Sequence, residues 1–190
     1  MACTALTKGR GLSCDRISGG IKNVYFAVYD QVTSIPAASG AVTDIEMGSN
    51  SLYKYTMPLG VASLTDTITG SRENGTIFYT PTVNIILNRL TKEDQNEIKL
   101  LGATKVRIFV QLNQTHTATG NDVIVCLGMI NGMELNAGTM DSGAAFGDRN
   151  GYTLTFDGLE PEPFAMLEDV AAGGAPFSNA GISGLTIDTN

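Results

Sequence analysis

The chain has 190 residues, 43% of them hydrophobic, and a formal net charge of -7. This length predicts a single domain, residues 1–190, whose core is large enough to fold without disulfides or a structural metal. An acidic chain is not expected to hold nucleic acid tightly, because phosphate neutralisation needs clustered lysine and arginine. There is no apolar run of about twenty residues and no leader-like segment after Met1, so we expect a soluble intracellular protein without a membrane partner.

The two ends of the chain carry opposite charge. Residues 1–20 are small, polar and glycine-containing, which predicts an N-terminal arm, and Lys8, Arg10 and Arg16 make it basic. Residues 157–190 contain six acidic side chains and no basic one, and they are rich in glycine, alanine and serine. We expect an acidic, glycine-rich C-terminal extension there, with a short helix opened by Pro161 and an extended tail.

The first part of the chain predicts strands of two kinds. Residues 21–29 alternate between apolar and polar side chains, as in a core strand with one dry face. Residues 42–47, 52–57 and 63–69 are also strand-like, but they are polar at most positions on both faces and are separated by turn sequences. We therefore expect residues 41–70 to form a projecting β-hairpin arm that finds its partner elsewhere, and a solvated meander on the same domain is the alternative.

Residues 75–113 are the centre of the predicted fold, with a strand, a short helix and a second strand. Apolar residues occupy the odd positions of the first strand, and threonine and asparagine alternate with them. Thr91-Lys92-Glu93-Asp94 has the order of a capping box, and Gly102 follows the last turn of a helix about ten residues long. The next strand, residues 104–112, again alternates between apolar and polar side chains.

Three further strands complete the predicted fold. Residues 122–130 are almost continuously apolar, which indicates a strand covered on both faces. Residues 133–137 and 152–156 alternate, as expected of strands with one buried face. Together these patterns predict a mainly β fold, a β-sandwich or barrel with one flanking α-helix and a projecting hairpin.

The sequence predicts no catalytic, cofactor-binding or metal site. His116 is the only histidine and has no cysteine or second histidine near it in sequence, so we expect it at the surface. Cys126 lies in an apolar strand, where it is expected to act as a small hydrophobic residue. Residues 148–151 lack the ligands of a calcium loop and predict a plain turn. The carboxylates of Glu160 and Glu162 are expected to be exposed and solvated.

Two stretches of the chain resemble bacteriophage tail tube proteins. The first is FYTPTVNI at residues 78–85 followed by LTKEDQNEIKL at residues 90–100. The second is GMINGMELNAGT at residues 128–139 followed by AFGDRNGYTLTF at residues 145–156, which is similar to the final hairpin of that family. The resemblance covers about residues 75–165 and is one of pattern order, without an invariant motif.

This resemblance implies a structural virion protein, made in the cytoplasm of a bacterial host, that is not an enzyme and has no cofactor. It implies self-assembly into hexameric rings that stack as the tail tube, with other phage tail proteins as partners and double-stranded DNA passing through the lumen without specific binding. The polar residues that could face the lumen are Thr80, Thr82, Asn84, Asn88, Lys105, Arg107 and Gln111. The residues of the expected arm that could contact the next ring are Asp44, Glu46, Tyr53, Lys54, Tyr55 and Asp66.

Two alternatives stay open from the sequence. The nearer one is another ring component of the same fold, such as a tail tube initiator, a terminator or a baseplate hub subunit. The more distant one is a monomeric β-barrel binding module, or a hydrolase that uses Cys14 or Cys126.

Overall fold

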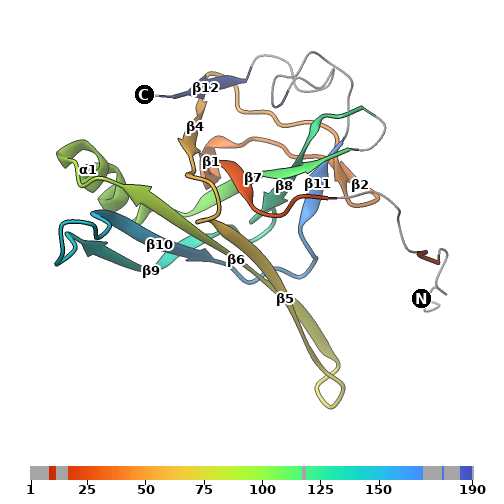
Figure 1. The fold of residues 1–190 in the computed structure, drawn as a ribbon. Helices are drawn as coiled ribbons and strands as arrows, with labels where there is room; N and C mark the ends of the chain where they lie inside the picture. The colour runs from red at the N-terminus through yellow and green to blue at the C-terminus, as the bar shows by residue number, and fades with distance from the viewer. Residues whose placement is uncertain (1–8, 12–16, 117–118, 169–176, 178–184, 190) are drawn as a thin grey trace.

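The computed structural model describes residues 9–11, 17–116, 119–168, 177 and 185–189 (Figure 1). In chain order its elements are β1 (Ile21–Val28), the 3-10 helix η1 (Tyr29–Gln31), β2 (Ala37–Ala38), β3 (Ala41–Val42), β4 (Ser51–Thr56), β5 (Ser63–Ser71), β6 (Thr76–Asn88), α1 (Lys92–Leu101), β7 (Val106–Thr115), β8 (Asp122–Leu127), β9 (Glu134–Asp141), β10 (Gly151–Asp157), β11 (Ala165–Leu167) and β12 (Thr186–Asp188). No helix within the described ranges is long and apolar enough to cross a membrane.

The strands form two sheets, which confirms the predicted mainly β fold with one flanking helix. The larger sheet has eight strands in the order β12-β4-β1-β7-β8-β11-β3-β2, and the smaller sheet has four in the order β5-β6-β10-β9. Neighbouring strands of the smaller sheet all pair antiparallel. Helix α1 joins β6 of the smaller sheet to β7 of the larger one and lies at one end of the sandwich (Figure 1).

The main core lies between the two sheets. Side chains alternate along a strand, so each sheet turns one set of apolar residues toward the other. The buried members of this layer include Val24, Phe26, Val83, Ile85, Ile108, Val110, Leu154 and Phe156. The rings of Phe26 and Phe156 meet across the layer with their centroids 5.0 Å apart. Burial of each such side chain contributes about 1.5–3 kcal/mol, which makes this layer the main source of the fold's stability.

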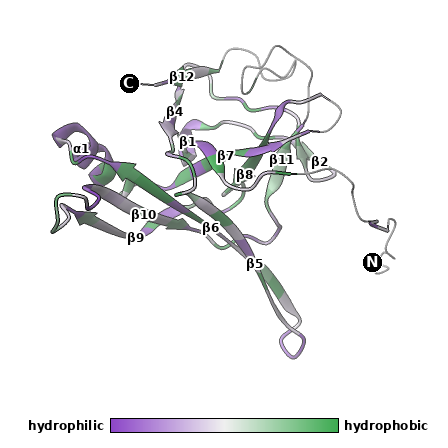
Figure 2. Cartoon of the chain, viewed as in Figure 1, coloured by the Kyte–Doolittle hydropathy of each residue, from purple (hydrophilic) through white to green (hydrophobic). Residues whose placement is uncertain are grey.

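A second apolar cluster covers the opposite face of the larger sheet. Tyr25, Phe109 and Cys126 point to this side and are at most 1% exposed. The segment between β1 and β4 covers them with its own buried residues, Val32, Val42, Ile45 and Met47. The central strands therefore have two dry faces, and Figure 2 shows hydrophobic residues along them. This confirms the prediction for β8 and corrects the one for β1, which was expected to have a single dry face.

Helix α1 begins where the sequence predicts. Thr91 is its N-cap: the hydroxyl accepts a hydrogen bond from the Asp94 N–H at 3.0 Å and donates one to the Asp94 carboxylate at 2.5 Å. Glu93 and Asp94 lie in the first turn and Lys99 in the last, the order that the helix dipole favours. Ile98 is buried against the main core, which fixes the helix to the end of the sandwich.

The hairpin predicted at residues 41–70 is wrong in its placement. Strand β4 pairs with β1 in the larger sheet, whereas β5 pairs with β6 in the smaller one, so the two strand-like runs separate. Val42, Ile45 and Leu52 are at most 2% exposed because they belong to the second apolar cluster. A hairpin does project from the body, but β5 and the first half of β6 form it around a turn at residues 72–75 (Figure 1).

The helix predicted after Pro161 does not form in the described residues. Residues 165–167 are strand β11 instead, which pairs antiparallel with β8 and parallel with β3. Strand β12 pairs parallel with β4 at the other side of the larger sheet, so the C-terminal extension contributes to both of its edge regions. Residues 9–11 and 17–19 have no regular secondary structure, and the remainder of the predicted N-terminal arm lies outside the described residues.

Candidate functional site

The outer face of the smaller sheet carries uncharged polar side chains. On β6 it presents Thr80, Thr82 and Asn84, at positions that alternate with the apolar residues of the core. The two neighbouring strands continue this face. The Asn84 amide donates to Ser63 Oγ on β5 at 3.5 Å, and Thr155 Oγ1 on β10 donates to Asn84 Oδ1 at 2.7 Å. Thr80, Thr82 and Asn84, three of the residues expected to face a lumen, therefore lie together on one polar face.

Charge on this sheet has one sign. Strands β5, β6, β9 and β10 contain no lysine or arginine, and their acidic residues are Asp66, Glu134, Asp141 and Asp157. The Asp157 carboxylate accepts a hydrogen bond from the Asn136 amide at 2.8 Å. Hydroxyl groups extend the face through Thr65, Thr67 and Thr153, whereas Phe78 and Ile86 are its apolar positions on β6. The four strands therefore contribute no cationic side chain, although Arg149, in the loop before β10, donates to Thr153 Oγ1 on this face at 2.7 Å.

Both edges of the smaller sheet are bare within the described part of the chain. Strand β5 forms one edge with nine residues and β9 the other with eight, and no described strand pairs with their outer sides. Soluble proteins usually protect such edges with lysine, proline or very short strands. Neither β5 nor β9 contains lysine or proline, although the β9 pairing has a bulge beside Phe156. The two edges therefore leave backbone hydrogen-bonding groups with which a further strand could pair.

The three polar residues predicted on the strand after the helix lie elsewhere. Arg107 is half-buried, and its guanidinium donates to the carbonyl oxygens of Tyr29 at 2.7 Å, Val32 at 3.2 Å and Met129 at 3.3 Å. It also stacks over the Tyr29 ring at 4.0 Å, so Arg107 fastens loops of the body together. Lys105 is exposed but precedes β7, and it lies 3.9 Å from the Glu134 carboxylate. Neither residue lies on the smaller sheet.

Gln111 is buried, and its predicted outward orientation is wrong. It is 7% exposed, and its amide donates to the Asp122 carboxylate at 2.7 Å. Its carbonyl oxygen accepts hydrogen bonds from Asn23 at 2.6 Å and from the Tyr25 hydroxyl at 3.0 Å. Lys22 completes the network with a 2.6 Å contact to Asp122. Burial, followed by the Asp122 charge, raises the pKa of Tyr25 to about 12.

The residues predicted to contact a next ring are spread over the body. Tyr53, Lys54 and Tyr55 lie on β4, opposite β1, and Tyr55 packs edge-on against Phe26 with ring centroids 5.1 Å apart. Burial, with the acidic residues of α1, raises the pKa of Tyr55 to about 12.

The other three contact candidates do not form one surface either. The Asp44 carboxylate accepts a hydrogen bond from the Ile45 N–H at 2.8 Å. The backbone of exposed Glu46 forms an antiparallel β-bridge with that of Ser34. Asp66 alone belongs to the projecting hairpin, where it accepts the Phe164 N–H at 3.2 Å. Asn88, the last of the lumen candidates, is exposed at the end of β6 opposite Gly151.

Glu160 is the structurally important residue that the sequence did not reveal. It was expected to be solvated, but it is 5% exposed and its carboxylate accepts three backbone N–H groups, from Ile130 at 3.2 Å, Asn131 at 2.9 Å and Gly132 at 3.1 Å. Its own backbone N–H and carbonyl pair with Tyr79 on β6 at 2.9 and 2.8 Å. Glu160 thus ties the loop at residues 128–132 to the base of the projecting hairpin.

The candidate catalytic and metal-binding groups form no assembled site within the described part of the chain, and Cys14 lies outside that part. Cys126 is 0% exposed, and burial raises the pKa of its thiol, so the reactive thiolate is disfavoured. His116 is half-buried in a loop, and its backbone N–H donates to the Asn121 carbonyl oxygen at 2.8 Å. Asp148 caps a tight turn, where the N–H groups of Ala145 and Ala144 lower the pKa of its carboxyl. Among the described residues no three His, Cys, Asp or Glu side chains are grouped to hold a metal ion.

Comparison with family models, with curated proteins and with solved structures finds no match for this chain. The features that bear on function are therefore those of the molecule itself: a neutral-to-acidic sheet face, two bare edges and a projecting hairpin.

Proposed function

We propose that this chain is a structural protein of a bacteriophage tail, not an enzyme, and that it self-assembles into stacked hexameric rings forming the tail tube. The observation that carries this proposal is the smaller sheet, whose four strands contain no lysine or arginine and whose two edge strands are long and bare in the described part of the chain. A sheet that ends in two different bare strands can bind a copy of itself at each edge, β5 of one copy beside β9 of the next. Such a head-to-tail contact produces a ring when the rotation closes.

The size of such a ring suits a duplex. Six copies of a four-stranded sheet give a barrel of twenty-four strands. With strands about 4.8 Å apart and tilted about 40°, the barrel circumference is about 150 Å and its backbone diameter about 48 Å. After side chains fill part of that width, a channel wider than a DNA duplex remains. A barrel of about sixteen strands already encloses an aqueous pore.

The chemistry of the sheet suits passage without retention. Threonine and asparagine side chains are already hydrogen-bonded to each other across the strands, as Thr155 and Asn84 are at 2.7 Å. Tight DNA binding depends on lysine and arginine, which the four strands lack. Six chains of -7 also give a ring of about -42, whose field repels phosphate.

The test is electron microscopy of the purified chain together with a variant that blocks one edge. We expect hollow rings or tubes from the unmodified chain; single rings that never stack would indicate a terminator or initiator instead, and a stable monomer at high concentration would refute the proposal. Thr139→Pro and Met140→Pro introduce proline at adjacent positions of β9, whose N–H groups point to opposite sides of the strand. Only one of the two substitutions removes an N–H group on the free side of β9, and that variant should keep the native unfolding midpoint but fail to form rings. Alanine at the same position should leave ring formation unchanged.

A further inference from the structure

The projecting part of the β5–β6 hairpin extends beyond the body that supports it. Strand β6 pairs with β10 only from Thr82 onward, and the last tie on the hairpin is the bridge between Tyr79 and Glu160. From Tyr79 to the turn at Gly75 the strand covers about 14 Å at about 3.4 Å per residue. Figure 1 shows the end of the β5–β6 hairpin extending past the other strands of the molecule.

One face of the projecting segment continues the pattern of the core without being covered. Along β6 the core-side positions are Val83 and Pro81, both buried, then half-buried Tyr79, and then Ile77, which is 60% exposed. On β5, opposite Tyr79, Ile68 is 64% exposed. Figure 2 shows that hydrophobic colouring reaches into the projection. An apolar face that continues beyond the buried core and stays exposed indicates that a surface of another molecule covers it.

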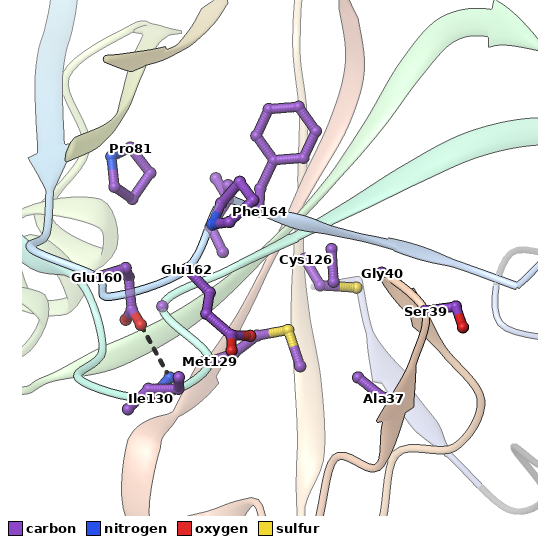
Figure 3. Close-up of a pocket in the computed structure, with 14 residues that line it drawn as sticks. Ala37, Ser39, Gly40, Pro81, Cys126, Met129, Ile130, Glu160, Glu162 and Phe164 are labelled. Atoms are coloured by element: carbon purple, nitrogen blue, oxygen red, sulfur yellow. Dashed lines mark hydrogen bonds between the residues drawn. The ribbon is translucent and has the colours of Figure 1, made fainter. Parts of the chain in front are cut away.

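A matching hollow lies at the base of the same hairpin. It has a volume of about 330 Å³ and opens between the β2–β3 turn, the loop after β8 and the segment that precedes β11. Pro81, Met129 and Phe164 supply apolar walls, and Figure 3 shows them around the opening. Ile130, 48% exposed, stands at its side. Small-ligand clefts begin at about 300 Å³, so the hollow has room for aliphatic side chains.

Charge around the hollow favours an occupant with a cation. Glu160 and Glu162 line it, and among the described residues that line it there is no lysine or arginine. The Glu160 carboxylate is held by three backbone N–H groups, which leaves the exposed Glu162 as the free carboxylate of the opening. The turn of the projecting hairpin carries exposed Arg72, next to exposed Glu73, and Arg72 is the residue that directly follows β5. Apolar residues followed by an arginine are therefore the complement of this hollow.

We propose that the projecting hairpin of one copy docks into the hollow of a second copy, with Ile68 and Ile77 in the apolar recess and Arg72 near Glu162. The donor and the acceptor are different surfaces of one chain, so each docked copy still offers its own hairpin and its own hollow. A contact of this kind propagates without closing, and it fits stacking of one ring on the next. This inference rests on the proposed function, because it names the contact that would stack the rings.

The decisive experiment is a disulfide trap between two differently tagged chains. One carries Ile77→Cys and the other Ile130→Cys, both with Cys3→Ser and Cys14→Ser, while Cys126 stays because it is fully buried. After co-assembly and oxidation, we expect a mixed dimer of the two tags. The control replaces the acceptor by Gln95→Cys, on the exposed side of α1, and should give at least tenfold less mixed dimer.

The outcomes separate this inference from the proposed function. The docking contact is overturned if tubes form normally but no mixed dimer appears. It is also overturned if the Gln95→Cys control gives as much mixed dimer as Ile130→Cys. Neither result would contradict the tube itself. Chains that stay monomeric overturn both.

A second set of variants tests the contact without cysteine. Ile68→Ser with Ile77→Ser changes exposed residues only, so the unfolding midpoint should be unchanged while sedimentable polymer falls at least tenfold and unstacked rings remain. Arg72→Glu alone should also reduce polymer, and adding Glu162→Arg in the same chain should restore it. Polymer yields equal to the unmodified chain in the double serine variant, or no restoration by the charge exchange, would contradict the docking geometry.

Discussion

Substitution of Glu160 by glutamine should destabilise the fold by much more than its conservative chemistry suggests. Glu160 Oε1 accepts the N–H groups of Asn131 and Gly132, and Oε2 accepts that of Ile130. In Glu160→Gln an amide oxygen can keep the first two contacts, but an NH₂ group then faces the Ile130 N–H, donor against donor. The variant therefore loses one hydrogen bond and the charge on the other two.

The magnitude follows from these contacts. Three hydrogen bonds to a charged acceptor contribute about 1.5 kcal/mol each at the low end, and two neutral ones contribute about 1 kcal/mol each. The difference is a loss of about 2–3 kcal/mol in the free energy of unfolding. Urea unfolding followed by circular dichroism measures it, since the chain has no tryptophan. All variants should be compared at one protein concentration.

The matched control is Glu162→Gln, because Glu162 is exposed two residues away. It should change the free energy of unfolding by less than about 0.5 kcal/mol, as most surface substitutions do. If the two glutamine variants were equally stable, the three N–H contacts of Glu160 would contribute nothing net, and the reasoning from a buried carboxylate would be refuted.

Two further predictions concern other buried groups. The pKa values of Tyr25 and Tyr55 in the folded state are raised from 10.0 to about 12, so the folded state retains protons that the unfolded chain releases. The free energy of unfolding should therefore be unchanged below pH 10 and should fall as the pH rises to 12. A thermal midpoint that stays constant between pH 10 and pH 12 would contradict this. Gly132→Ala should destabilise the fold by about 2 kcal/mol in urea unfolding, because Gly132 has φ of +83° and a new Cβ would lie 2.6 Å from Lys105 Cγ. The same change at Gly60, whose φ is +78° with open space around it, should cause a smaller loss, and equal losses would exclude the steric part of the argument.

The sequence predicted those features of the fold that depend on residues close together in the chain, namely helix capping and strand alternation. The capping residues around Thr91 and the period of two along β6 depend on neighbours in sequence, and both were confirmed, whereas β7 is buried on both faces from Ile108 to Gln111. The course of residues 41–50 could not be predicted in this way, because Val42, Ile45 and Met47 follow no regular period and cover a sheet face as an irregular segment.

The candidate site was predictable only in part, for the same reason. Thr80, Thr82 and Asn84 were placed correctly on a polar face by alternation, whereas Gln111 lies within an equally regular pattern and is buried by a second layer of chain. Glu160 binds amides 28 to 30 residues away, a distance over which no sequence pattern was available. The one hint was Gly132, since a glycine in that loop permits the positive φ that the contact requires.

The bare edges of the smaller sheet also bear on how the purified chain must be handled. Any extended peptide can add to a free strand margin, so a newly made molecule is exposed to fibrous misassembly until a proper neighbour arrives. Concentrated, warm solutions of the chain should therefore yield fibrous aggregates, and slow production at low temperature should reduce them.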